Sequence, residues 1–189
     1  MGTYLGASEK LVFNPDFIEV SNNSKIIFSE GYQFTSGENF SAFLKILKKT
    51  DKKTKFALSL SDPGVVHTFK DRFKEVFKVR KADYLFCNKE EATSLVGDNF
   101  VKDLGSIAVN FVVTNGAESS YVVENGSYAE IKAKNVKAID SNGAGDIFAG
   151  AALNKIIEGD SFLNACKFGN YASSKIVQEK SPRLSIDQY

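Results

Sequence analysis

The stretch Ser106-Ile-Ala-Val-Asn-Phe-Val-Val-Thr114 is the strongest strand signal in the chain, and it is apolar on both faces. A strand of this kind suits the middle of a parallel sheet that helices cover on both sides. On its N-terminal side, runs of strand character alternate with runs of helical period, over residues 24–31, 36–49, 55–60, 65–78, 84–87 and 89–95. Because such alternation builds parallel sheets through right-handed crossovers, the sequence predicts an α/β fold with a mainly parallel sheet.

The C-terminal side of this strand adds a β-hairpin and two helices. Strand-like residues 119–123 and 127–132 flank Glu124-Asn-Gly126, and Asn-Gly between two such runs is a strong hairpin signal. The helices are predicted over residues 145–158 and 161–180. The first of them is apolar nearly all round, so we expect it to be buried.

Length and charge limit the classes of partner. A chain of 189 residues is expected to form a single domain, residues 1–189. The net charge of +1 gives no reason to expect nucleic acid, and no apolar run is long enough to span a bilayer. Six lysines between Lys45 and Lys55 fall on a helix and its exit loop without interleaved aromatic residues. We interpret them as a solvated surface and predict no nucleic-acid and no membrane partner.

The cysteines, the single histidine and the N-terminus carry no signal of their own. Cys87 and Cys166 lie far apart in the sequence and match no zinc or redox spacing, so we expect buried, reduced thiols. His67 is expected to be a surface or capping residue, because no partner motif accompanies it. Residues 1–8 lack a basic region followed by an apolar run, which argues against a signal peptide and favours a cytoplasmic protein.

The segment Asp140-Ser-Asn-Gly-Ala-Gly-Asp146, here called the glycine turn, carries the strongest chemical signal. It leads directly into the apolar helix, so its backbone N–H groups lie at the positive end of that helix, where they can bind a phosphate or an oxyanion. Asp146 adds a carboxylate at the same place, a combination that phosphoryl transfer to a hydroxyl group requires. The alternative is an ordinary loop capped by an aspartate. A dinucleotide-binding motif is disfavoured, because Gly-x-Gly-x-x-Gly would need glycine at Phe148.

These residues, with Phe148 and Gly150, resemble the C-terminal signature of the PfkB (ribokinase-like) carbohydrate kinase family, in particular its adenosine-kinase-like branch. Other motifs of that family follow in the same order along the chain. They are Thr3-Tyr-Leu-Gly-Ala7, Leu58-Ser-Leu-Ser-Asp-Pro63, Asn88-Lys-Glu-Glu91, Val112-Val-Thr-Asn-Gly116 and Phe168-Gly-Asn-Tyr-Ala172. The resemblance covers almost the whole chain and implies a three-layer α/β/α fold.

The resemblance implies an ATP-dependent phosphotransferase with an alcohol group as acceptor, a kinase of sugars or nucleosides. Asp146 would be the base that accepts the proton of the substrate hydroxyl. The N–H groups of Gly143, Ala144, Gly145 and Asp146 would form the anion hole for the transferred phosphoryl group.

The resemblance also assigns the binding of ATP and Mg²⁺. Thr114 and Gly116 would line the ATP site, with Asn170 near the adenine. Glu91 with Asn88 would hold Mg²⁺ through water molecules. A monovalent cation near Asp140 and Asn142 is compatible with the family.

Local alternatives exist for the weaker motifs. Asn88 and Glu91 could be a helix cap followed by a solvated carboxylate, and Thr114 with Gly116 could be a plain strand-to-hairpin turn. The chain also departs from the family pattern at Ser141, where threonine is usual.

A larger departure is an absence. Family members carry an N-terminal portion with a Gly-Gly motif, acceptor contacts and most of a β lid, and this sequence contains no Gly-Gly. We therefore expect a sheet that is incomplete on its N-terminal side, and a homodimer or a separate N-terminal portion. Two hypotheses follow, an active sugar or nucleoside kinase and a non-catalytic nucleotide-binding or assembly module.

Overall fold

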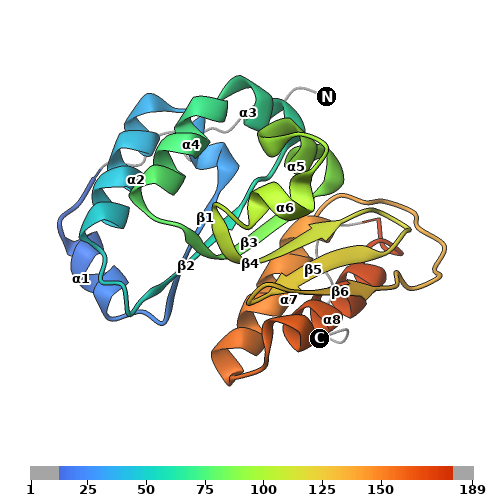
Figure 1. The fold of residues 1–189 in the computed structure, drawn as a ribbon. Helices are drawn as coiled ribbons and strands as arrows, with labels where there is room; N and C mark the ends of the chain where they lie inside the picture. The colour runs from blue at the N-terminus through green and yellow to red at the C-terminus, as the bar shows by residue number, and fades with distance from the viewer. Residues whose placement is uncertain (1–12, 181–189) are drawn as a thin grey trace. The chain divides into compact units, whose positions relative to one another are not determined.

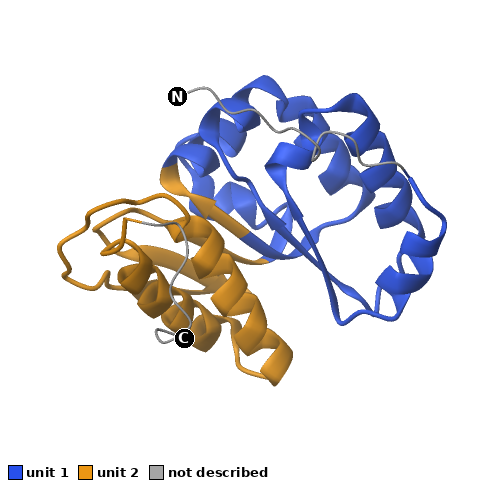
Figure 2. Cartoon of the chain, turned by 180° about the vertical axis from the view of Figure 1, so that it is seen from behind, with its two compact units in different colours: residues 1–85, 90–109 blue, residues 86–89, 110–189 orange. Residues whose placement is uncertain are grey.

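The computed structural model describes residues 13–180. The segment Thr3-Tyr-Leu-Gly-Ala7 of the resemblance lies outside the described residues. The chain divides into two compact units, residues 1–85 with 90–109 and residues 86–89 with 110–189, shown in blue and orange in Figure 2. The two units are described separately, and the single domain over residues 1–189 stays a prediction.

The described strands form one open sheet in the order β1-β2-β3-β4-β5-β6. Strand β1 (Ile26–Glu30) pairs in parallel with β2 (Lys55–Ser59), and β3 (Ala82–Asn88) and β4 (Ala108–Thr114) follow. Strand β5 (Ser120–Glu124) is antiparallel to both β4 and β6 (Ser127–Ile131). The predicted α/β class and the hairpin are confirmed (Figure 1).

Short helices and loops connect the strands of the first unit. Its helices are α1 (Asp16–Asn22), η2 (Gly31–Phe34), α2 (Gly37–Lys49), α3 (Pro63–Thr68), α4 (Lys70–Val79), most of α5 (Lys89–Val96) and α6 (Phe100–Leu104). Helix α2 begins at a side-chain cap, since the Ser36 hydroxyl group accepts a hydrogen bond from the Asn39 N–H. Phe34 lies at the centre of the core and packs edge-on against Phe73, with ring centroids 4.9 Å apart.

One predicted helix is divided in two. The phenylalanine period over residues 65–78 predicted a continuous helix, but Phe69 leaves the helical conformation at φ −111° and ψ 25° and separates α3 from α4. The Asp62 side chain and Pro63 begin α3 as an N-cap and first-turn proline. Because the apolar period continues across the break, the period alone could not reveal it.

In the second unit, the hairpin leads to two packed helices, α7 (Ala144–Glu158) and α8 (Phe162–Ile176). The hairpin turn has positive φ at both Asn125 (49°) and Gly126 (82°), as a type I′ turn requires. The expectation that the helix over residues 145–158 is buried all round was wrong: Phe148, Ala149 and Ala152 are buried, but Ile157 is 45% exposed. Its buried side packs on α8 and the opposite side remains open.

Several smaller predictions can be compared with the structure. Cys87 and Cys166 are free and buried, as expected. Burial, with a smaller contribution from Glu124, raises the pKa of the Cys166 thiol. His67 and the six lysines between Lys45 and Lys55 are exposed, also as expected. None of the helices described between residues 13 and 180 has the length and apolar character needed to cross a membrane.

Candidate functional site

The glycine turn is shaped by its own side chains. The Asp140 carboxylate accepts hydrogen bonds from the backbone N–H of Asn142 (2.9 Å) and from its side-chain amide (3.3 Å). Gly143 then adopts φ 77° and ψ 0°, and the Ala144 N–H donates to the Ser141 carbonyl oxygen (3.2 Å). These values match a type II turn, whose third position requires a positive φ and therefore favours glycine.

This turn leaves the N-terminus of α7 open. Within residues 13–180, the N–H groups of Gly143, Gly145 and Asp146 donate to no protein acceptor, and no side chain caps the helix. Gly145 and Asp146 are both exposed. Unpaired N–H groups at the positive end of a helix bind anions. The Ala144 N–H is engaged within the turn, so three of the four expected donors are free to do so.

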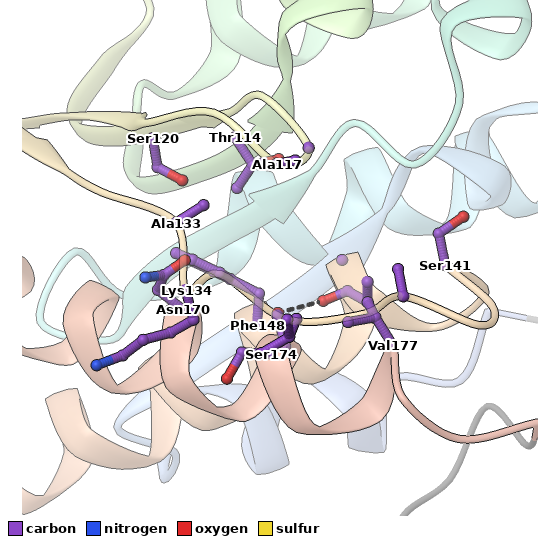
Figure 3. Close-up of a pocket in the computed structure, with 16 residues that line it drawn as sticks. Thr114, Ala117, Ser120, Ala133, Lys134, Ser141, Phe148, Asn170, Ser174 and Val177 are labelled. Atoms are coloured by element: carbon purple, nitrogen blue, oxygen red, sulfur yellow. Dashed lines mark hydrogen bonds between the residues drawn. The ribbon is translucent and has the colours of Figure 1, made fainter.

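The turn borders a cavity of about 290 Å³ that lies entirely in the second unit. Figure 3 shows Thr114 and Ser120 on one side of the cavity, Asn170 and Ser174 of α8 on the other side, and Ser141 near one end. The remaining wall is mainly apolar and comes from Phe148 and small side chains of the segment before the turn. This volume lies at the lower end of the range for small-molecule sites.

Five of the nine predicted site residues line this cavity: Thr114, Gly116, Ala144, Gly145 and Asn170. The Thr114 hydroxyl donates to the Cys87 carbonyl oxygen (3.4 Å), which fixes it at the end of β4. Gly116 has φ 57° with open space beside it, so its backbone conformation explains the glycine. The Asn170 amide donates to the Lys132 carbonyl oxygen (3.0 Å), and no donor among residues 13–180 bonds to its amide oxygen.

The other four predicted residues lie outside the cavity wall. Gly143 and Asp146 flank the lining residues Ala144 and Gly145 in the turn and the first turn of α7. Asn88 ends β3 in the second unit, whereas Glu91 lies in the first turn of α5 in the first unit. Glu91 is only 6% exposed, so the alternative of a solvated carboxylate is wrong.

A metal site built from side chains alone is not present among residues 13–180, where no three His, Cys, Asp or Glu residues come together. Mg²⁺ does not need such a cluster. It keeps several water ligands and is commonly held by one or two carboxylates together with substrate phosphates. The assignment of Mg²⁺ to Glu91 and Asn88, which lie in different units, therefore stays a prediction.

Sequence reasoning missed part of the cavity wall. Ala133, Lys134, Val136 and Ala138 belong to the irregular segment between β6 and α7, and no period reveals which of its side chains face inward. Ser173 and Ser174 lie on α8 one turn beyond Asn170, a spacing that could have suggested the same face. Among the described residues that line the cavity, Lys134 alone carries a charge.

Tyr128, the hairpin residue whose pKa is raised, does not line this cavity. Burial, followed by the hydrogen bond to Glu130, raises the pKa of Tyr128 to about 12. Neither Tyr128 nor Cys166 lines the cavity. The groups at the open N-terminus of α7 are the backbone N–H groups of the turn and the Asp146 carboxylate.

Several kinases are similar to this chain in sequence and fold. An adenosine kinase of Saccharomyces cerevisiae is 25% identical over 203 residues, which cover 95% of this chain and 58% of that protein. A ribokinase of Staphylococcus aureus is 33% identical over 115 residues, which cover 55% of this chain and 38% of that protein. The crystal structure of an adenosine kinase from Sinorhizobium meliloti superposes with a TM-score of 0.82 at 26% identity, covering 89% of this chain and 54% of that one.

The chain spans about half the length of these two adenosine kinases, which match it along most of its own length. The expected ribokinase-like architecture is confirmed by the superposition. The family described as "pfkB family carbohydrate kinase" matches residues 2–188, almost the entire sequence. The chain therefore belongs to the pfkB family of carbohydrate kinases.

Proposed function

We propose that this protein acts in an ATP-dependent kinase reaction, in which the γ-phosphate of ATP is transferred to a hydroxyl group of a nucleoside or a sugar. The observation that carries the proposal is the open N-terminus of α7, where three free N–H groups and the Asp146 carboxylate meet beside a cavity. The adenosine kinases among the relatives make adenosine the first acceptor to test.

The cavity supplies the part of the site that would hold the nucleotide. Its apolar wall suits a flat base, and the Asn170 amide oxygen and the Thr114 hydroxyl group offer polar contacts beside it. The phosphates would then extend toward Gly145 at the turn. Mg²⁺ would come with ATP, keep several water ligands and offset charge on the phosphates.

In the reaction, the acceptor oxygen forms a bond to the γ-phosphorus while the bond from that phosphorus to the bridging oxygen of ADP breaks. The Asp146 carboxylate accepts the proton of the acceptor hydroxyl. A carboxylate is a weak base, so its main contribution is to orient the attacking oxygen. The N–H groups of Gly143, Gly145 and Asp146 stabilise the charge on the transferred group without reorganising during the step.

A second candidate function is a nucleotide-binding or assembly module without catalysis. The observation that favours this module is the share of a relative that the chain matches, which is only 54% of the adenosine kinase structure from Sinorhizobium meliloti. Residues that bind the acceptor in the relatives could lie in the part without a counterpart. The same cavity would then bind ATP but transfer nothing.

Replacing Asp146 separates these candidates. We expect Asp146→Asn to lower the rate of phosphate transfer to adenosine or a sugar by about a thousandfold, while the Kd for Mg·ATP changes by less than about threefold. Transfer is measured with labelled ATP and binding by calorimetry. Asp160→Asn, an exposed aspartate just after α7, is the matched control and keeps the wild-type rate.

The wild-type chain gives the deciding comparison. If it binds Mg·ATP and phosphorylates none of the nucleosides and sugars tested, the module without catalysis is the correct description. If it binds no ATP at all, both candidates are wrong. If Asp146→Asn retains the full rate of transfer, the role of Asp146 as base is wrong even for an active kinase.

A further inference from the structure

Helix α8 and its C-cap residue present three residues at i, i+4 and i+8 toward the glycine turn and α7: Gly169, Ser173 and the C-cap Val177. This spacing places them on one side of the helix. Each of them contacts a different part of the segment that leads into the site. Because α7 and α8 pack together, the row follows the glycine turn and the first turn of α7 from one end to the other.

The two ends of the row hold the chain before and after the turn. The Val177 carbonyl oxygen accepts hydrogen bonds from the N–H groups of Ile139 (2.6 Å) and Asp140 (3.2 Å). At the other end, a Cβ atom built on Gly169 would lie 2.8 Å from the Phe148 carbonyl oxygen. Only glycine therefore allows α8 to approach α7 this closely at that point.

Ser173 holds the middle of the row. Its hydroxyl group donates to the Ala144 carbonyl oxygen at 2.7 Å, the hydrogen bond drawn as a dashed line in Figure 3. That carbonyl belongs to the same planar peptide group as the Gly145 N–H, and in a trans peptide the two bonds point in opposite directions. Fixing the Ala144 carbonyl oxygen on the α8 side therefore fixes the direction of the Gly145 N–H on the other side.

We propose that Ser173 is a positioning residue, which aims the Gly145 N–H at the phosphoryl group that the kinase reaction transfers. The inference rests on the proposed function. Ser173 does not need to touch the reacting atoms for this role, because it acts through the peptide between Ala144 and Gly145. A helix-packing serine without this role would affect stability but not the direction of one N–H group.

Two substitutions and a control test the inference in the full chain. Loss of a direct oxyanion donor lowers kcat by about 10²–10³, so we expect loss of its support in Ser173→Ala to lower kcat by about tenfold with KM for ATP within about twofold. Ser173→Thr keeps the hydroxyl group and should restore kcat to within about threefold of wild type. Ser106→Ala removes a similar hydroxyl-to-carbonyl hydrogen bond (2.7 Å to Asp103) in the first unit and should leave kcat unchanged.

A second measurement does not depend on activity. The amide chemical shift of Gly145 in an NMR spectrum should move in Ser173→Ala, because the peptide that carries this N–H is no longer held, and Ser173→Thr should return it to the wild-type position. An unchanged Gly145 chemical shift in Ser173→Ala would overturn the inference. So would an unchanged kcat in an active chain, or a loss that appears only in KM. If the wild-type chain transfers no phosphate, the proposed function fails, and the chemical-shift comparison alone decides whether Ser173 holds the turn.

Discussion

The N-termini of α7 and α8, two helices that pack against each other, are completed in opposite ways. At α8, the Ser161 side chain accepts from the Asn164 N–H, and the Glu124 carboxylate accepts from the N–H groups of Phe162 (2.7 Å) and Leu163 (3.3 Å). At α7, the cap is Gly143, which has no side chain to offer. One helix is closed by the protein, and the other is open.

The N-terminus of α8 shows which capping groups are missing at the N-terminus of α7. A carboxylate and a hydroxyl group satisfy the first N–H groups of α8, as an anion at the positive end of a helix does. The same kinds of donor are exposed at α7 beside a cavity. The exposed N–H groups at α7 can bond to water, and the proposed function assigns them an anion that comes from outside the chain.

The largest expected effect among the tests of this contrast comes from the backbone of the turn. Gly143 has φ 77°, a conformation that costs a residue with a Cβ atom about 1–2 kcal/mol. Gly143→Ala should relieve this strain by reshaping the turn and should lower the rate of phosphate transfer by about a hundredfold, as loss of an oxyanion donor does. Steady-state kinetics on the purified variant would measure the loss.

Gly126→Ala is the matched control for strain alone. Gly126 has φ 82° in the hairpin turn with no atom within 4 Å of an added Cβ atom. We expect it to lose about as much stability as Gly143→Ala, about 1–2 kcal/mol, and to keep its rate of phosphate transfer. Equal rate losses in both variants would show that strain, and not the geometry of the open helix end, is responsible.

The next largest effect should come from opening the closed end. Glu124→Ala removes both carboxylate hydrogen bonds at α8 and should lower the free energy of unfolding by about 2 kcal/mol, because hydrogen bonds to charged groups are the strong ones. Urea denaturation would measure it. Asp146→Ala at α7 should change stability by less than about 1 kcal/mol, since a charge near a helix N-terminus contributes no more than that at an exposed position.

This contrast was only partly predictable from the sequence. The hairpin at Glu124-Asn-Gly126 and the glycine turn were predictable, because each depends on a positive φ that few residues adopt. The capping role of Glu124 was not predictable, since Glu124 lies 38 and 39 positions before the two residues whose N–H groups it accepts. A turn can be predicted from the few residues that form it. A cap supplied by a distant strand depends on how the strands and helices pack, which a local sequence pattern does not show.

The misses on the rest of the fold have the same origin. Helix α1 and the short α6 were not predicted, because seven and five residues give too little periodicity to recognise. The burial of α7 was overestimated because its composition is apolar nearly all round, while Ile157 and other residues on one side of the helix are exposed. The segment between β6 and α7 lines the cavity without regular structure, so no pattern in it identified Val136 or Ala138.

The smallest effect gives the most direct view of the open helix end. Orthophosphate is the simplest anion that could occupy it, and at a concentration equal to its Kd it would stabilise the chain by about 0.4 kcal/mol, or about 1 °C in Tm. The measurement is a thermal melt in phosphate against chloride at equal ionic strength. Gly143→Ala should abolish this difference, because it disturbs the turn that presents the N–H groups. Glu124→Ala should enlarge it, because phosphate can then also occupy the N-terminus of α8 that the carboxylate has left. A phosphate effect of the same size in all three proteins would mean that the anion binds elsewhere, and that the two helix ends do not differ in the way their hydrogen bonds indicate.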